Sequence, residues 1–300
     1  MFPDILPFLT QQLTEPTSIE LAQQLKTEPI RTALRPEPII TPYVNQGQGG
    51  TPILLLHGFD SSLFEFRRLL PLLSAYYEIW AVDLLGFGLT ERDPNLNLNP
   101  QTIRTHLHSC WQTLIQQPVV LVGASMGGAV ALDFVLAYPE AVRALVLIDS
   151  AGVSSGPVMG KFLFPPLDFL ATEFLRNPQV RQKISENAYF DKRLASADAQ
   201  ICAALHLETP SWRRALINFA KSGGYGNFSL RLPEIQQKIL ILWGDQDRIL
   251  GTKDAAKFQQ KLPGAKLVWL KNCGHVPHLE QPQATAASIL EFCRAENAPE

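Results

Sequence analysis

Six short runs of apolar residues are the feature that most restricts how this chain can fold. They span residues 53–56, 79–82, 119–122, 144–148, 239–243 and 267–270. Runs without polar interruption are typical of strands buried on both faces, as in a parallel sheet covered by helices. Amphipathic segments of helix length lie between or after them, at 62–75, 101–116, 126–138, 253–261 and 283–294. This alternation predicts an α/β fold with a doubly wound, mostly parallel sheet.

The alternation fails once, between residues 148 and 239. Residues 153–232 are rich in Phe, Leu and Pro, with helical patterns at 178–184 and 212–220. A segment of this length inside an α/β frame is an inserted domain rather than a loop. It follows the carboxyl end of a strand, where open α/β sheets place their ligand crevice. We therefore expect a helical cap at 153–232 over a core made of residues 39–152 and 233–300.

The first 38 residues are polar, end in a proline-rich stretch and are expected to form an N-terminal appendage. Their start lacks the basic region of a signal peptide, and no apolar run in the chain reaches the length of about 18 residues that spans a membrane. We expect a cytoplasmic protein whose contact with a membrane is at most peripheral.

The composition excludes several classes of protein. Hydrophobic residues make up 46% of the 300 residues, charged residues 18%, and the net charge is −2. This balance is too apolar for a disordered chain and offers no basic face for nucleic acid. The sequence contains neither CxxC nor HExxH, so no metal site or other cofactor is expected. The four cysteines, at positions 110, 202, 273 and 293, are expected to be buried, reduced thiols.

The apolar run 119–122 leads directly into the sequence GASMG at residues 123–127. G-x-S-x-G between a strand and a helix is the pattern of a nucleophile held on a sharp turn. Gly123 and Gly127 leave room for the turn, which exposes the Ser125 hydroxyl and aims the N–H groups of the following helix at the reacting oxygen. We therefore expect Ser125 to be a nucleophile.

A serine hydroxyl needs a base to remove its proton, and in this pattern the acid and the histidine follow the serine in the sequence. Asp247 comes after the run 239–243, and His275 comes after the run 267–270. Both therefore follow carboxyl ends of strands, as Ser125 does. Asp247 is preferred to Asp245 because the loop has turned further toward the rim, and Asp149, after another strand, is the alternative acid.

Two backbone N–H groups are expected to stabilise the oxyanion, those of Met126 and of Phe59, which follows the HG pair after the run 53–56. The remaining histidines are expected to be structural or peripheral. His57 would bond to backbone beneath the site, and His278 would order the loop after His275. His106 and His108 would lie exposed on a helix, and His206, in the insert, is a weaker candidate for substrate contact.

These residues resemble the α/β-hydrolase superfamily over roughly residues 51–293. The resemblance implies acyl transfer on an ester, thioester, amide or activated C–C bond. Longer stretches are similar to the chlorophyll dephytylase group of plants and cyanobacteria: 83–88, 129–139, 222–225 and 272–282. That resemblance implies hydrolysis of the phytyl ester of chlorophyll to chlorophyllide and phytol, with Ser125, Asp247 and His275 as the triad, and places any membrane contact at the thylakoid.

A phytyl ester requires a large apolar groove. The candidates for it are aromatic residues of the insert: Phe162, Phe164, Phe169, Trp212, Phe219 and Tyr225. Alternatives stay open, namely a lipase-like or small-ester carboxylesterase, and a C–C bond hydrolase of a dienone acid. The last of these needs a cation for the substrate carboxylate, and Arg213 and Arg214 are the candidates.

Overall fold

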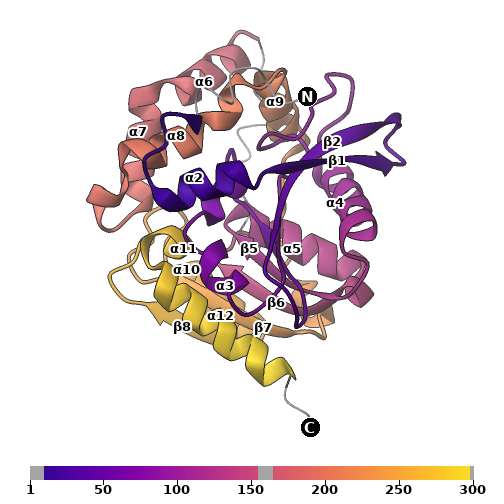
Figure 1. The fold of residues 1–300 in the computed structure, drawn as a ribbon, viewed down its shortest axis with the longest axis vertical. Coiled ribbons are helices and arrows are strands. Elements are labelled where there is room, and N and C mark those ends of the chain that lie inside the picture. Colours follow the sequence, from indigo (N-terminus) through magenta and orange to yellow (C-terminus); the bar gives the residue numbers. More distant parts are fainter. Residues whose placement is uncertain (1–9, 155–164, 298–300) are drawn as a thin grey trace.

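An eight-stranded sheet forms the centre of the protein (Figure 1). The structure is a computed structural model that describes residues 10–154 and 165–297. The strand order is β1-β2-β4-β3-β5-β6-β7-β8, and the six strands from β3 to β8 are parallel to one another. Their bounds are β3 Ile53–Leu56, β4 Ile79–Val82, β5 Val119–Ala124, β6 Val142–Ile148, β7 Lys238–Gly244 and β8 Lys266–Leu270. All six predicted apolar runs are therefore strands of one sheet, and the predicted α/β fold is confirmed.

Helices cover both faces of this sheet. Alternate residues of each buried strand point to opposite faces, so that Leu54 and Leu121 pack in one apolar cluster, and Leu55 and Val122 in another. The first cluster contains α4 (Pro100–Leu114), α5 (Met126–Ala137) and α10 (Lys253–Lys261). The second contains α3 (Leu70–Ser74) and α12 (Pro282–Asn297). The predicted helix at 62–75 is divided into a 3-10 turn, η1 (Leu63–Phe66), and α3.

The expectation that residues 1–38 form an appendage is wrong for residues 26–38. Strands β1 (Lys26–Thr32) and β2 (Arg35–Gln46) form a hairpin that extends the sheet through antiparallel pairing of β2 with β4. Proline concealed these strands because it lacks the N–H of the ladder. The ladder tolerates it here since β2 pairs with β4 only from Tyr43 onward, so that residues 35–42, which include the three prolines of β2, have β1 as their only strand neighbour.

Between β6 and β7 the described residues contain helices and no strand. The α-helices gather at one end of the molecule in Figure 1: α6 Leu167–Arg176, α7 Pro178–Ala188, α8 Ala197–Ala204 and α9 Trp212–Ser222. Short 3-10 turns link them, among them η4 (Lys192–Leu194) and η5 (Leu205–Glu208). We call residues 165–232 the cap. None of the helices in the described ranges is long and apolar enough to cross a bilayer.

The segment before β1 ties the cap to the core. Helix α2 (Pro16–Gln23) lies between them in Figure 1. Asp198 of α8 accepts hydrogen bonds from the backbone N–H of Thr14 and Glu15 and from the Ser18 hydroxyl. Glu15 in turn pairs with Arg68 of the core. Residues 14–18 thus hold α8 against the segment that follows η1.

Candidate active site

Ser125 lies at the turn between β5 and α5. Its backbone has φ 52° and ψ −118°, a strained conformation for a residue with a side chain. A Cβ at Gly123 would lie 2.3 Å from the Gly127 carbonyl oxygen, and a Cβ at Gly127 would lie 2.1 Å from that of Leu56. Both positions therefore require glycine, as the sequence pattern predicts, and the turn brings the start of α5 against the end of β3.

His275 contacts both of the residues that the sequence pairs with it. Its Nε2 lies 3.0 Å from Ser125 Oγ, and its Nδ1 lies 3.0 Å from Asp247 Oδ2. Burial alone would raise the pKa of Asp247, but the hydrogen bond to His275 and the N–H groups of Ile249 and Leu250 hold it below the ordinary value. A carboxylate on one side of the imidazole and a hydroxyl on the other is the arrangement that activates serine.

Asp149, the alternative acid, lies directly behind Asp247. It accepts hydrogen bonds from the Gly244 N–H, and burial together with the neighbouring Asp247 raises its pKa well above the ordinary value. Ligand atoms of Asp149, Asp247 and His275 lie within 4.8 Å of one another, a spacing that could hold a metal ion. Both ring nitrogens of His275 are already engaged by Ser125 and Asp247, so hydrogen bonds account for the cluster without one.

The two predicted oxyanion donors belong to segments that adjoin Ser125. Met126 is the first residue of α5, so its N–H has no acceptor within the helix. Phe59 follows Gly58 in the loop after β3, and a Cβ at Gly58 would lie 3.4 Å from Ser125 Cβ. We call residues 57–60 the oxyanion loop, because it brings the backbone before Phe59 next to Ser125.

Buried polar side chains hold the oxyanion loop in the core. His57 Nε2 accepts from the Leu84 N–H, so its Nδ1 carries the proton and donates to the Gly58 carbonyl, 2.8 Å away. Glu65 accepts from the Gly58 N–H at 2.7 Å and bonds to His278 Nε2 at 3.1 Å. Burial alone would raise the pKa of Glu65, but His278 and the Gly58 N–H lower it to about 2. The structural roles expected for His57 and His278 agree with these bonds.

Side chains of the cap hold the oxyanion loop through Asp60. Asp60 accepts from His206 Nε2, Trp212 Nε1 and Arg181 Nη1, each at 2.8 Å. His206 is fully buried and is not among the residues that line the cavity beside Ser125, so it supports Asp60 and does not face substrate. The prediction of an exposed His106 is wrong as well, since it is buried at the sheet and bonds to Thr41 at 2.8 Å.

A cavity of about 300 Å³ opens beside Ser125 and His275. The core contributes residues of the oxyanion loop, η1 and the segments after β7 and β8. The cap contributes α6, α7 and α8 through Leu175, Arg181, Ile184, Ser185, Ala188, Ala199, Cys202 and Ala203. Most of the exposed surface within it is apolar. The site therefore combines a serine–histidine–aspartate cluster with an apolar chamber between core and cap.

Comparison with known proteins identifies the family. A model of the alpha/beta hydrolase family matches residues 53–288. The chain belongs to the alpha/beta hydrolase family. It is 33% identical to the alpha/beta hydrolase domain-containing protein VTE7 of Arabidopsis thaliana, over 97% of this chain and 90% of that protein.

Other relatives of this hydrolase differ in activity. The 2-hydroxy-6-oxo-2,4-heptadienoate hydrolase of Pseudomonas putida is 26% identical, over 83% of this chain and 91% of that protein. A thermophilic esterase from Thermogutta terrifontis has a similar fold, with a TM-score of 0.77 and 22% identity over 91% of this chain and all of that one. The names of these two proteins state different activities, and the likeness to the esterase concerns the fold alone.

Of the aromatic residues predicted to bind substrate, the four that the structure describes do not line the cavity of this hydrolase. Trp212 is buried with its N–H on Asp60, and Phe219 packs beneath the cavity wall against Phe59 and Phe87. Tyr225 packs on Phe219, and Phe169 is half exposed under the guanidinium of Arg213. Phe162 and Phe164 lie outside the described residues. Helix orientation, which the sequence does not show, turned the aromatic faces of α6 and α9 away from Ser125.

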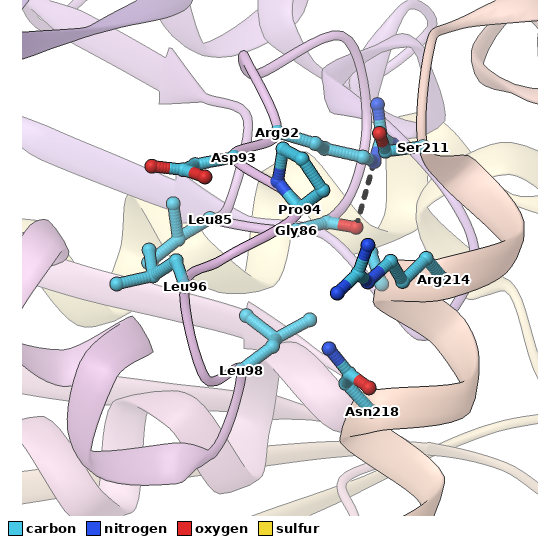
Figure 2. Close-up of a pocket in the computed structure, with 11 residues that line it drawn as sticks. Leu85, Gly86, Arg92, Asp93, Pro94, Leu96, Leu98, Ser211, Arg214 and Asn218 are labelled. Carbon is cyan, nitrogen blue, oxygen red and sulfur yellow. Dashed lines mark hydrogen bonds between the residues drawn. The ribbon is translucent and has the colours of Figure 1, made fainter.

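Arg213 and Arg214, the predicted partners of a substrate carboxylate, also lie away from the Ser125 cavity. Arg213 pairs with Glu173. Figure 2 shows Arg214 and Asn218 of α9 facing Leu98 and Gly86 across a separate pocket of only about 20 Å³. Neither arginine is among the residues that line the Ser125 cavity.

Arg67, which no motif of the sequence indicated, follows η1 and lines the cavity. Its side chain is 2% exposed, and its Nε and Nη2 atoms have no hydrogen-bond partner. Glu15 and Asp198 form longer ion pairs with it, 3.6 and 3.8 Å from Nε. Burial alone would lower the pKa of Arg67, but its polar surroundings raise it, so a charged guanidinium stands in the cavity wall.

Proposed function

We propose that this protein hydrolyses carboxylic esters through an acyl-enzyme on Ser125. Ser125 Oγ attacks the ester carbonyl while His275 Nε2 takes its proton and Asp247 holds the imidazole. The N–H groups of Phe59 and Met126 donate to the oxyanion. His275 returns the proton to the departing alcohol, then removes one from water, which frees the acid from Ser125. The observation that carries this proposal is the pair of 3.0 Å contacts that His275 makes with Ser125 and Asp247.

The proposed substrate is the phytyl ester of chlorophyll. The apolar cavity between α7 and the oxyanion loop offers a place for a long branched chain, while the flat macrocycle would remain at the mouth. Helix α6, whose Leu175 lines the cavity, exposes an apolar stripe, with Leu167, Leu170 and Phe174 all more than half exposed. A stripe of this kind favours peripheral contact with a lipid surface, in this proposal the thylakoid membrane facing the cytoplasm.

One observation favours a second candidate. Hydrolysis of a C–C bond in a dienone acid requires a cation for the substrate carboxylate, and Arg67 places a buried guanidinium with unbonded N–H groups in the cavity wall. The relative from Pseudomonas putida carries this activity in its name. A lipase-like or small-ester activity would use the same cavity without Arg67.

A two-phase assay tests the first proposal. Chlorophyll a in mild detergent is incubated with the protein or with Ser125→Ala, and the pigment is partitioned between hexane and aqueous acetone. Green pigment in the aqueous phase with the wild type alone supports cleavage of the phytyl ester. Pigment that stays in hexane, while the wild type cleaves short synthetic esters or a dienone acid, rejects the chlorophyll substrate and retains one of the alternatives.

A further inference from the structure

We propose that Asp60 is a positioning residue through which the cap controls the oxyanion hole. This inference deepens the proposed function, since it concerns how fast Ser125 reacts rather than which ester it cleaves. Asp60 follows Phe59 directly, and its side chain is the point where three separate elements of the cap meet the oxyanion loop.

The carboxylate of Asp60 accepts three hydrogen bonds of 2.8 Å from side chains of the cap. Oδ1 accepts from His206 of η5 and from Trp212 at the start of α9, and Oδ2 accepts from Arg181 of α7. Arg181 also donates to the Asp60 carbonyl at 3.4 Å and to the Ala203 carbonyl of α8 at 2.6 Å. The carboxylate therefore joins α7, η5 and α9, and through Arg181 it reaches α8.

The charge of Asp60 is fixed by these partners. Its side chain is 9% exposed. Burial alone would raise the pKa of Asp60, but His206 and Arg181 hold it far below the ordinary value. A buried carboxylate that remains ionised forms short, directional bonds with the groups that stabilise it. Motion of the cap helices is therefore transmitted to the backbone of residue 60.

The backbone at Asp60 makes this coupling relevant to catalysis. Its φ is 48°, a region that aspartate and asparagine enter more readily than most residues. This conformation sets the direction of the chain immediately after Phe59, whose N–H is the proposed oxyanion donor. His57 and Glu65 hold the Gly58 side of the loop. On the other side of Phe59, the core holds the Ser61 carbonyl through the Gly88 N–H at 2.9 Å, and the cap holds the side chain of Asp60.

A displaced oxyanion donor weakens the transition state more than the bound ground state. Loss of the Asp60 contacts should therefore slow acylation and leave KM nearly unchanged. A role limited to holding the cap in place would instead change stability and the binding of long substrates, with no selective effect on the acylation rate of the folded protein.

The test compares Asp60→Asn with the wild type. Asparagine keeps the size and the tolerance for positive φ, but it loses the charge and one acceptor. We would measure the rate constant for labelling of Ser125 by a fluorophosphonate, together with kcat and KM for p-nitrophenyl butyrate. We expect both labelling and kcat to fall by about 10- to 100-fold, with KM changed by less than about threefold. An Asp60→Asn protein that is folded and labels at the wild-type rate overturns the inference.

Two further variants guard against misfolding of Asp60→Asn. Trp212→Phe removes one donor and keeps an aromatic ring, and Arg181→Met removes another and keeps much of the apolar stem. Each should reduce labelling by about 2- to 10-fold, and Trp212→Phe should add little in the Asp60→Asn background, because both act on one carboxylate. Fully additive effects, or no effect of either single variant, contradict the inference.

Labelling by a fluorophosphonate needs no substrate, so it separates this inference from the proposed function. If Ser125 labels rapidly in the wild type and slowly in Asp60→Asn while no ester is hydrolysed, the role of Asp60 stands and the proposed function fails. If esters are hydrolysed and the variants label normally, the proposed function stands and the role of Asp60 fails.

Discussion

The rim of the core and the cap both contribute to the active site, but they do so by different means. On the rim, Ser125, Asp247 and His275 follow the ends of three parallel strands, and the strands alone bring them together. In the cap, the residues that face the cavity are selected by how each helix lies on the core. The difference teaches that the triad depends on local backbone geometry, whereas the lining of the cavity depends on tertiary packing.

The largest expected effect on activity concerns the triad at the carboxyl ends of the strands. Ser125→Ala should lower kcat/KM for any cleaved ester by about four to six orders of magnitude, because the triad acts as a unit. The matched control is Ser185→Ala, which removes a hydroxyl from the cap side of the same cavity and should retain nearly full activity. Rates would be measured with p-nitrophenyl butyrate. Equal loss in both variants would show that the hydroxyl of Ser125 has no special role.

The second prediction separates the two acids beneath the rim. Asp247→Asn should cost about 10⁴-fold in kcat, because an amide does not hold His275 in the required tautomer. Asp149→Asn should cost less than about threefold in kcat, because the raised pKa of Asp149 already favours its neutral form, which an amide resembles. Steady-state kinetics of both variants on one ester decide the matter. A larger loss for Asp149→Asn would transfer the role of the acid to Asp149.

The same contrast explains what the sequence could predict. The six apolar runs and the glycines around Ser125 carry their structural reason within a few residues, so the parallel strands and the turn at Ser125 were predictable. Strands β1 and β2 were missed because their prolines hide the strand pattern. Whether a strand tolerates proline depends on which of its residues pair with a second strand, and the sequence does not show that pairing. Arg67 and Asp60 carried no signal, since nothing near them in the sequence shows that they face the cap.

A third prediction tests the cap. Ile184 lines the cavity, whereas Phe169, on the neighbouring helix α6, does not. Ile184→Ala should lower kcat/KM for long-chain esters about tenfold, as expected for losing about three buried carbons at ~0.8 kcal/mol each, partly offset by the exposure of Ile184. Phe169→Ala should change it by less than about twofold. A chain-length series of p-nitrophenyl esters provides the measurement, and a larger effect of Phe169→Ala would restore the aromatic groove that the sequence predicted.

The smallest expected effects concern stability against acid. Glu65 in the core and Asp191 in the cap both have a pKa lowered to about 2. Glu65 is buried between the Gly58 N–H, His278 and His57, while Asp191 pairs with Arg193, whose side chain is 90% exposed. A lowered pKa stabilises the fold above the pKa of the unfolded chain, near 4.5 for Glu, and this contribution is lost as the pH falls toward 2.

Although Glu65 and Asp191 have similar pKa values, they should contribute unequally to the free energy of unfolding. For Glu65 the difference corresponds to about 3 kcal/mol in the free energy of unfolding, so Glu65→Gln should lower that free energy at pH 7 by up to that amount. The gap between the variant and the wild type should narrow between about pH 5 and pH 2. Asp191→Asn should have almost no effect at any pH, because solvent screens an exposed ion pair. Urea unfolding across this pH range provides the measurement. A pH-independent gap for Glu65→Gln would mean that its hydrogen bonds, and not its charge, hold the oxyanion loop.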